Sequence, residues 1–339
     1  MAPSPRLSVL VVTYRSAGAL AALLPALQRE LRPGDELVVV DNASGDGSAE
    51  AAAAAGARVL RNTVNAGFAA ACDQAAAAAR GDLLLLLNPD AVPEPGFRDA
   101  IERPWGGGFD AWMGLVLDGD RVNTSGGVVH FTGLAWAGEA GAPASAARGA
   151  ARREVGFLSG ACLAVPRAAW LAVGGFSPDF FMYHEDVDLS LRLRLRGARI
   201  GVEPAAVVDH DYAFAKGDTK WRMLERNRWA TILRTYPAPL LALLAPALVA
   251  LELALWPAAL AGGWAPAKAA ATADLARALP RLLRERRAVQ ATRRVSPRAF
   301  AAGLTAELSS PYLGAAGRSR ALAAALRAYW AVVVALLPR

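Results

Sequence analysis

The stretch "LLLLLNPD" at residues 83–90 decides the fold class of this 339-residue chain. Five consecutive leucines are typical of a strand that is buried on both faces, as in the centre of a parallel sheet. The run ends abruptly in an amide, a proline and a carboxylate, Asn88-Pro89-Asp90. An apolar strand that ends in such polar residues indicates a functional site at the edge of the sheet where the strand ends.

Strand and helix signals alternate over the first 92 residues, which predicts right-handed βαβ units and a mostly parallel sheet flanked by helices. The predicted strands cover 7–14, 35–42, 57–62 and 82–88, and the predicted helices cover 17–31, 48–56 and 67–81. For residues 93–155, the sequence predicts only irregular strands and a mobile loop. Order returns with a strand at 157–165, helices at 166–173 and 185–196, and a strand at 199–212. The fold class is therefore α/β and Rossmann-like.

Composition excludes some classes of protein. The two cysteines have no paired spacing, which excludes a disulfide framework and favours a reducing compartment. The N-terminal apolar run is shorter than that of a secretory signal. The net charge of +7 is concentrated in residues 271–300, which hold eight arginines and two acidic residues. We expect this segment to meet an anionic membrane surface and not nucleic acid.

The C-terminal third is helical, apolar and rich in arginine. Residues 237–264 carry one charge, Glu252, and are long enough to span a bilayer. Three prolines interrupt them, so interfacial or hairpin contact is favoured over a clean span. We expect an α/β domain over 1–218 and a membrane-associating region over 219–339, peripheral on the inner, cytoplasmic face of the cell membrane. Packing on the α/β domain or in a homo-oligomer is the alternative.

Three predicted strands end in polar residues: Thr13-Tyr14-Arg15, Asp41-Asn42 and Asn88-Pro89-Asp90. Ligands of open α/β sheets bind beyond the carboxyl ends of the strands, so three such ends on one edge predict a nucleotide site. Polar turns are the simpler explanation of any one of them. "NAGF" at 65–68 opens a predicted helix, whose N-terminus suits phosphates or sugar hydroxyls, or is merely the entry to that helix.

Five motifs in order carry a resemblance to a known family. They are "VVTYRS", "VVDNASGDGS", "NAGFAAACDQAAAAARGDLLLLLNPD", "GACLAVPRAAWLAVGGFSPDFFMYHEDVDLSLRLRLRG" and a later His210. Together they resemble the family-2 glycosyltransferases, nearest to the rhamnosyltransferase-like branch, over roughly residues 6–236. The resemblance implies a GT-A fold, a nucleotide-sugar donor, a divalent cation and inversion at the anomeric carbon.

The resemblance implies a site for Mg²⁺ or Mn²⁺, hard cations that prefer oxygen ligands. Asp90 is the expected metal ligand, and His210 corresponds to a histidine that often completes the site. Asn88 stands where many members carry an aspartate, so metal binding should depend more on the diphosphate. A plain turn at 88–90 and a histidine without a metal are the simpler alternatives.

The donor site follows from the same resemblance. Asp41 is expected to accept a hydrogen bond from N3–H of uracil or thymine. Further expected donor contacts are Thr13, Tyr14, Arg15, Asn65, Gly67, Phe68 and, for the diphosphate, Arg226 and Arg228 of the basic stretch 220–237. A solvated Arg15 is equally compatible with the sequence.

The catalytic base is expected in "HEDVD" at 184–188. The resemblance assigns deprotonation of the acceptor to Asp186, with Glu185 binding the acceptor or orienting Asp186. Adjacent carboxylates repel and raise a pKa, whereas the positive end of a helix lowers it. An acidic helix N-terminus without a catalytic role is the alternative.

These expectations describe an inverting glycosyltransferase that moves rhamnose from dTDP-rhamnose, or a sugar from a UDP donor, to a lipid-linked or polysaccharide acceptor. One alternative is a sugar-phosphate nucleotidyltransferase, although "TYRSAGAL" at 13–20 lacks its usual glycine-rich basic loop. A non-catalytic membrane scaffold is the other. A glycosyltransferase releases a nucleotide diphosphate, a nucleotidyltransferase releases pyrophosphate and a scaffold releases neither, so the released product distinguishes the three.

Overall fold

The computed structural model of the chain describes residues 3–210, 217–310 and 313–339. These residues form two compact units. A sheet unit comprises Met1–Gly127, Ala137–Leu189 and Ala198–Tyr212, and a helical unit comprises Val128–Trp136, Ser190–Gly197 and Ala213–Arg339. The sequence predicts one domain boundary, between residues 218 and 219. In the structure, two short earlier segments also belong to the helical unit.

A ten-stranded sheet forms the sheet unit, with strand order β10-β12-β6-β11-β4-β1-β2-β3 and with β5 and β7 pairing β12 and β6. The strands are β1 (Leu7–Thr13), β2 (Glu36–Asp41), β3 (Arg58–Arg61), β4 (Leu83–Leu87), β5 (Ala91–Pro93), β6 (Ala111–Asp118), β7 (Arg121–Thr124), β10 (Arg153–Glu154), β11 (Cys162–Pro166) and β12 (Ile200–His210). β8 (Gly127–Val129) and β9 (Ala135–Ala137) form a separate two-stranded ribbon.

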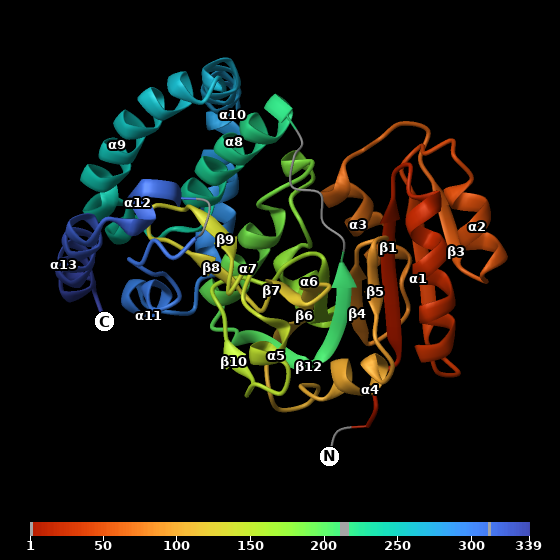
Figure 1. Ribbon diagram of the computed structural model, residues 1–339. Coiled ribbons are helices and arrows are strands. Elements are labelled where there is room, and N and C mark those ends of the chain that lie inside the picture. The colour runs from red at the N-terminus through yellow and green to blue at the C-terminus, as the bar shows by residue number, and fades with distance from the viewer. Residues whose placement is uncertain (1–2, 211–216, 311–312) are drawn as a thin grey trace. The chain divides into compact units, whose positions relative to one another are not determined.

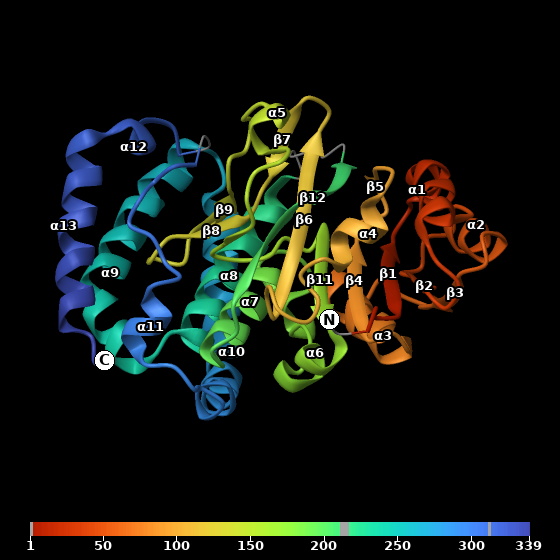
Figure 2. The ribbon, with the colours of Figure 1, turned by 90° about the horizontal axis from the view of Figure 1, so that it is seen from below.

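The first four long strands confirm the predicted βαβ units. β1, β2, β3 and β4 pair in parallel, and all five leucines of β4 are buried. The connecting helices are α1 (Ala17–Glu30), α2 (Ser48–Ala54) and α3 (Phe68–Ala78). Right-handed crossovers place α1 and α2 on one face of the sheet and α3 on the other (Figures 1 and 2).

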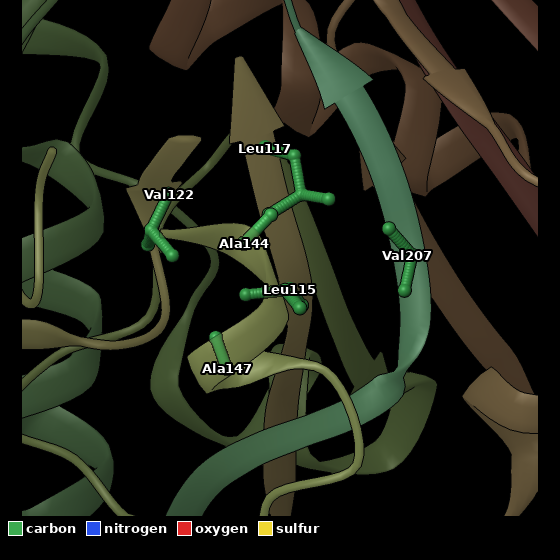
Figure 3. Packing of buried hydrophobic residues seen from close by; sticks show 6 residues of the cluster. All are labelled: Leu115, Leu117, Val122, Ala144, Ala147 and Val207. Carbon is green, nitrogen blue, oxygen red and sulfur yellow. The ribbon is translucent and has the colours of Figure 1, made fainter. Parts of the chain in front are cut away.

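The sequence underestimates the order of residues 93–155. They contain β6, which lies inside the sheet between β12 and β11 and is buried from Ala111 to Leu117. β11 runs antiparallel to both β4 and β6, and β6 is parallel to β12. Figure 3 shows how Leu115 and Leu117 of β6 pack with Val207 of β12 and with small residues of the following segment.

Short helices complete the sheet unit and lead into the other unit. They are α4 (Phe97–Glu102), α5 (Ala144–Ala147), α6 (Arg167–Val173), the 3₁₀ turn η1 (Pro178–Phe180) and α7 (Glu185–Leu195). The predicted strand at 157–165 begins only at Cys162, because Phe157 forms an isolated bridge with Gly127 and residues 160–161 make a turn before the sheet. The division between the units passes through α7.

The helical unit consists mainly of α8 (Gly217–Thr235), α9 (Ala238–Ala261), α10 (Ala265–Ala291), α11 (Pro297–Ala301), α12 (Gly314–Arg318) and α13 (Arg320–Leu336). α9 is continuous although Pro246 and Pro257 lie inside it. Among the described residues, α9 is the one helix long and apolar enough to cross a membrane, and 17% of its most apolar window is buried. Two earlier segments join this unit through backbone bonds, such as Phe131 N–H to Thr305 O at 3.0 Å and Arg294 N–H to Leu195 O at 2.8 Å.

Candidate active site

The tips of β1 and β2 lie side by side, because Thr13 pairs with Asp41 in the parallel register. The Thr13 hydroxyl donates to Asp41 Oδ1 at 2.9 Å, and the Ser44 amide donates to Asp41 Oδ2 at 3.2 Å. Tyr14 is exposed, and the guanidinium of Arg15 lies 5.4 Å from the centre of its ring. The carboxylate predicted to read a nucleobase is thus fixed at the sheet edge beside an exposed aromatic side chain.

Asn42, the residue after Asp41, organises the neighbouring "NAGF" loop. Its side-chain amide donates to Asn65 Oδ1 at 3.0 Å and to Gly67 O at 3.2 Å. Its oxygen accepts from the Ala66 amide at 3.0 Å. Sequence reasoning gave Asn42 no role beyond a polar strand end, although its place next to Asp41 in "VVDN" was a usable signal. Asn42 therefore ties the predicted donor loop to the tip of β2.

Gly67 joins the donor loop to the segment before α7. Its φ is +87°, and a Cβ built on it would lie 2.5 Å from Cδ2 of Phe181. The Phe181 carbonyl accepts from the Ala69 amide at 3.1 Å, in the first turn of α3. Phe181, Tyr183 and His184 all have positive φ, a strained conformation that functional loops often hold. Phe181 is a positioning residue that the sequence analysis did not identify.

Asp90 and His210, the predicted metal ligands, lie together although 120 residues separate them. Antiparallel pairing of β12 with β5 brings His210 opposite Ala91, and Asp90 Oδ1 lies 3.0 Å from His210 Nε2. Asn88 Nδ2 lies 3.3 Å from the same imidazole nitrogen. The His210 side chain is buried, whereas that of Asp90 is 42% exposed and faces solvent.

The chemistry of this pair is compatible with a divalent cation. The 3.0 Å separation is that of a hydrogen bond between imidazole and carboxylate, and it is also close to the spacing of two ligands at right angles on an ion with bonds of about 2.1 Å. The residues that the structure describes contain no group of three or more His, Cys, Asp or Glu side chains placed to hold a metal. A cation bound here would therefore take its remaining ligands from the donor or from water.

Asp186 is held in the first turn of α7 by backbone N–H groups. The Gly160 amide donates to its Oδ2 at 3.1 Å, and the Val187 amide donates to its Oδ1 at 2.8 Å. Burial raises the pKa of Asp186 from 3.8 to about 6, and the two amides oppose this rise. A carboxyl group with such a pKa is ionised at neutral pH and still basic enough to accept a proton.

Glu185 has a different environment. Its side chain is 5% exposed, and both burial and the charge of Asp186 raise its pKa well above the ordinary value. The sequence predicts repulsion between the adjacent carboxylates, and this contributes for Glu185, but burial is the larger cause for both residues. Burial therefore disfavours the ionised form of both carboxyl groups, and the charge of Asp186 adds to this for Glu185.

A chain of short contacts links these residues along one edge of the sheet unit. Asn88 N–H donates to Ala161 O at 3.1 Å, and the neighbouring Gly160 binds Asp186. A Cβ on Gly160 would lie 3.4 Å from the ring of Phe68 and 3.9 Å from Cβ of Asp186. The predicted donor loop, metal pair and base thus share one neighbourhood, with Gly160 at its centre.

Arg226 and Arg228, the predicted diphosphate contacts, belong to the helical unit. Arg228 is 1% exposed and its guanidinium donates to Glu225, to Glu252 and to the carbonyl of Thr132. These bonds occupy the guanidinium and favour a structural role for Arg228, and its expected contact with the diphosphate stays a prediction. Arg226 is partly exposed and donates to Asn227 Oδ1 at 2.8 Å, and its predicted role stays a prediction.

Comparison with known proteins agrees with this geometry. The family described as "Glycosyl transferase family 2" matches residues 8–113, and "Glycosyl transferase family group 2" matches residues 145–335. A relative from two strains of Mycobacterium tuberculosis, named N-acetylglucosaminyl-diphospho-decaprenol L-rhamnosyltransferase, is 30% identical over 244 residues, which cover 62% of this chain and 78% of the relative.

Two solved structures share the fold. One is Staphylococcus aureus TarS 1-349 in complex with UDP-GlcNAc, with a TM-score of 0.56, 17% identity and coverage of 97% of this chain and 89% of that chain. The other is the mannosyltransferase PcManGT from Pyrobaculum calidifontis with GDP-Man and Mn²⁺, with a TM-score of 0.50, 18% identity and coverage of 99% and 87%. The chain is a glycosyltransferase of family 2, with a GT-A fold and a sequence like that of the rhamnosyltransferases.

Proposed function

We propose that this glycosyltransferase moves a rhamnosyl group from dTDP-rhamnose to a lipid-linked acceptor, with inversion, at the inner face of the cell membrane. The observation that carries the chemistry is Asp186, a half-buried carboxylate with a pKa of about 6 held by two backbone amides. Transfer to a hydroxyl requires a base of this strength near the acceptor. The Mycobacterium tuberculosis relative, named for rhamnosyl transfer to a decaprenol-linked acceptor, supports the choice of donor and acceptor.

Each side chain has a defined task in this proposal. Asp186 accepts the proton of the acceptor hydroxyl as the oxygen attacks the anomeric carbon from the face opposite the nucleotide. Glu185, which keeps its proton, donates a hydrogen bond to the acceptor. Asp41 accepts from N3–H of thymine, and the "NAGF" loop holds the donor through backbone N–H groups at the start of α3.

Asp90 and His210 would hold Mg²⁺ or Mn²⁺, which would neutralise the charge on the departing nucleotide diphosphate. The 3.0 Å separation of their ligand atoms supports this assignment. Imidazole and carboxylate together suit Mn²⁺ better than Mg²⁺, which strongly prefers an all-oxygen shell. The test must therefore distinguish a lipid-linked acceptor from a polysaccharide acceptor and dTDP-rhamnose from UDP donors.

A direct transfer assay tests the proposal. The full chain, dTDP-rhamnose, Mn²⁺ and a short-chain polyprenyl diphosphate carrying N-acetylglucosamine should yield an elongated lipid and free dTDP. Asp186→Asn should lose transfer by about two to four orders of magnitude, as expected for removal of a general base. Asp179→Asn, an exposed carboxylate in the same region, is the matched control and should retain it.

Two outcomes would overturn the proposal. A donor panel in which UDP-GlcNAc or GDP-mannose, but not dTDP-rhamnose, gives product would refute the assigned sugar. Wild-type turnover by Asp186→Asn would refute the assigned base while leaving the family assignment intact.

A further inference from the structure

α9 has two faces of different character. Its buried residues Leu240, Leu244 and Leu248 recur every four positions and pack inside the helical unit. Val249, Leu253, Trp256 and Leu260 follow spacings of four, three and four residues, which place them on the opposite face of one helix. Val249 is 59% exposed, Leu253 69% and Leu260 70%. We call these four residues the outer face of α9.

An ion cluster in the middle of α9 fixes this orientation. The carboxylate of Glu252 accepts from Arg228, from Trp229 Nε1 at 2.9 Å and from Lys268 Nζ at 2.8 Å. Burial would raise the pKa of Glu252, but the hydrogen bond from Lys268 and the charge of Arg228 outweigh burial and lower it. Glu252 is therefore ionised, and its partners lie on α8 and α10, the helices that precede and follow α9 in the chain.

These contacts argue against α9 as a membrane-spanning helix. A span would carry the Glu252 carboxylate to the bilayer centre without its partners, or would draw α10 and its eight charged side chains in with it. It would also take Glu252 away from Arg228 and Lys268, each about 1% exposed, and leave both buried cations to share the carboxylate of Glu225. The same contacts leave the outer face free to meet a bilayer from the side.

The helical unit that carries the outer face of α9 also exposes positive charge. α10 follows α9 directly and exposes Arg277, Arg284 and Arg287, and Arg293, Arg294 and Arg298 are exposed beyond it. An apolar helix face combined with exposed arginines matches the chemistry of acyl chains beneath anionic headgroups. Trp256 lies 5.6 Å from Lys268 Nζ, at the border between the apolar face and the charges, where the membrane interface favours tryptophan.

We propose that α9 lies in the plane of the membrane and docks the protein on anionic lipid through its outer face, without crossing the bilayer. This inference deepens the proposed function, because it rests on a lipid-linked acceptor and places the enzyme where that acceptor lies. The occupant of the surface is the bilayer interface, and a second copy of the chain is the competing occupant.

Vesicle binding of the full chain tests the docking surface without donor or acceptor. Phosphatidylcholine vesicles that contain phosphatidylglycerol should bind the protein, and Leu253→Glu and Leu260→Glu should each lower the partition coefficient about tenfold. Leu171→Glu, at a leucine of α6 that is 56% exposed, is the matched control and should bind like the wild type. Arg284→Glu combined with Arg287→Glu should weaken binding to anionic vesicles alone.

Depth measurements distinguish an in-plane helix from a span. Val249→Cys and Leu260→Cys are eleven residues apart, about 16 Å along a helix. Burial raises the pKa of Cys162 to about 12 and that of Cys72 well above its ordinary value, so a spin label should react with the introduced cysteines. Equal shallow depths of both labels are expected, and depths that differ by most of that distance would overturn the proposal.

Two further outcomes would also overturn it. Equal vesicle binding by Leu253→Glu and Leu171→Glu would remove the outer face from the interaction. A dimer in light scattering that Leu253→Glu dissociates, with no vesicle binding by the wild type, would assign the face to a second copy. Transfer to a water-soluble acceptor by Leu253→Glu should stay at the wild-type rate, which separates failure of docking from failure of the proposed function.

Discussion

Replacement of Asp186 by asparagine should change the pH dependence of stability as well as abolish transfer. The folded protein holds the pKa of Asp186 at about 6, above its ordinary value of 3.8, so the ionised carboxylate destabilises the fold. The contribution of Asp186 to the free energy of unfolding therefore falls as the pH rises from below 3.8 to above 6. Asparagine has no charge to bury, and the variant should lack this loss.

The size of the effect follows from the shift. A rise from 3.8 to about 6 corresponds to about 3 kcal/mol, most of which is expressed between pH 4 and pH 8. The Gly160 and Val187 amides each donate to a different carboxylate oxygen of Asp186. An asparagine side chain has one oxygen, so the variant also loses a hydrogen bond. That second effect is independent of pH and cancels when the two pH values are compared.

Equilibrium urea unfolding of both proteins at pH 4 and pH 8 measures this difference. The free energy of unfolding of Asp186→Asn relative to the wild type should improve by about 2–3 kcal/mol from pH 4 to pH 8. Asp179→Asn serves as the control for the loss of a carboxylate at an exposed position. A relative stability that stays constant between pH 4 and pH 8 would refute the raised pKa and, with it, the assignment of Asp186 as the base.

Three further predictions concern activity and binding. kcat/KM should rise with pH through an apparent pKa near 6, the value held by Asp186, and a profile flat from pH 5 to pH 8 would contradict this. Gly67→Ala would place a Cβ 2.5 Å from an aromatic ring, so it should cost about 2–3 kcal/mol of stability and raise the donor KM. Gly34→Ala is the control, because Gly34 has a φ of +96° but open space around it, and it should cost less stability in chemical unfolding. Asp90→Asn should weaken Mn²⁺-dependent thermal stabilisation by dTDP about tenfold to a hundredfold in apparent affinity, and unchanged titrations would remove Asp90 from the cation site.

The sequence was sufficient where the signals were local. Alternation of strand and helix signals predicted β1 to β4 and their helices to within about three residues, because each short segment carries its own periodicity. The pairing of Asp90 with His210 also followed, through the resemblance to a family. β6 was not predicted as a central strand, because an apolar strand among glycine-rich turns acquires its place only from neighbours far along the chain.

The site was predictable in its residue types and less so in its energetics. Repulsion between Glu185 and Asp186 was expected to raise one of their pKa values, but burial raises the pKa of Asp186, and burial is a property of the folded chain. Arg228 lies in a basic stretch that suits phosphate, yet its partners Glu225 and Glu252 come from two helices whose packing the sequence does not reveal. Phe181 was missed because its role depends on contact with Gly67.

The antiparallel placement of β11 has a consequence for synthesis on the ribosome. β4, with its five leucines, pairs with β1 on one side as soon as it emerges, but its other edge waits for β11, about 75 residues later in the chain. At about 5–20 residues per second, the nascent chain carries this open leucine edge for roughly 4–15 s. Such an edge attracts other unpaired strands, so a chaperone that shields it should raise the yield of active enzyme.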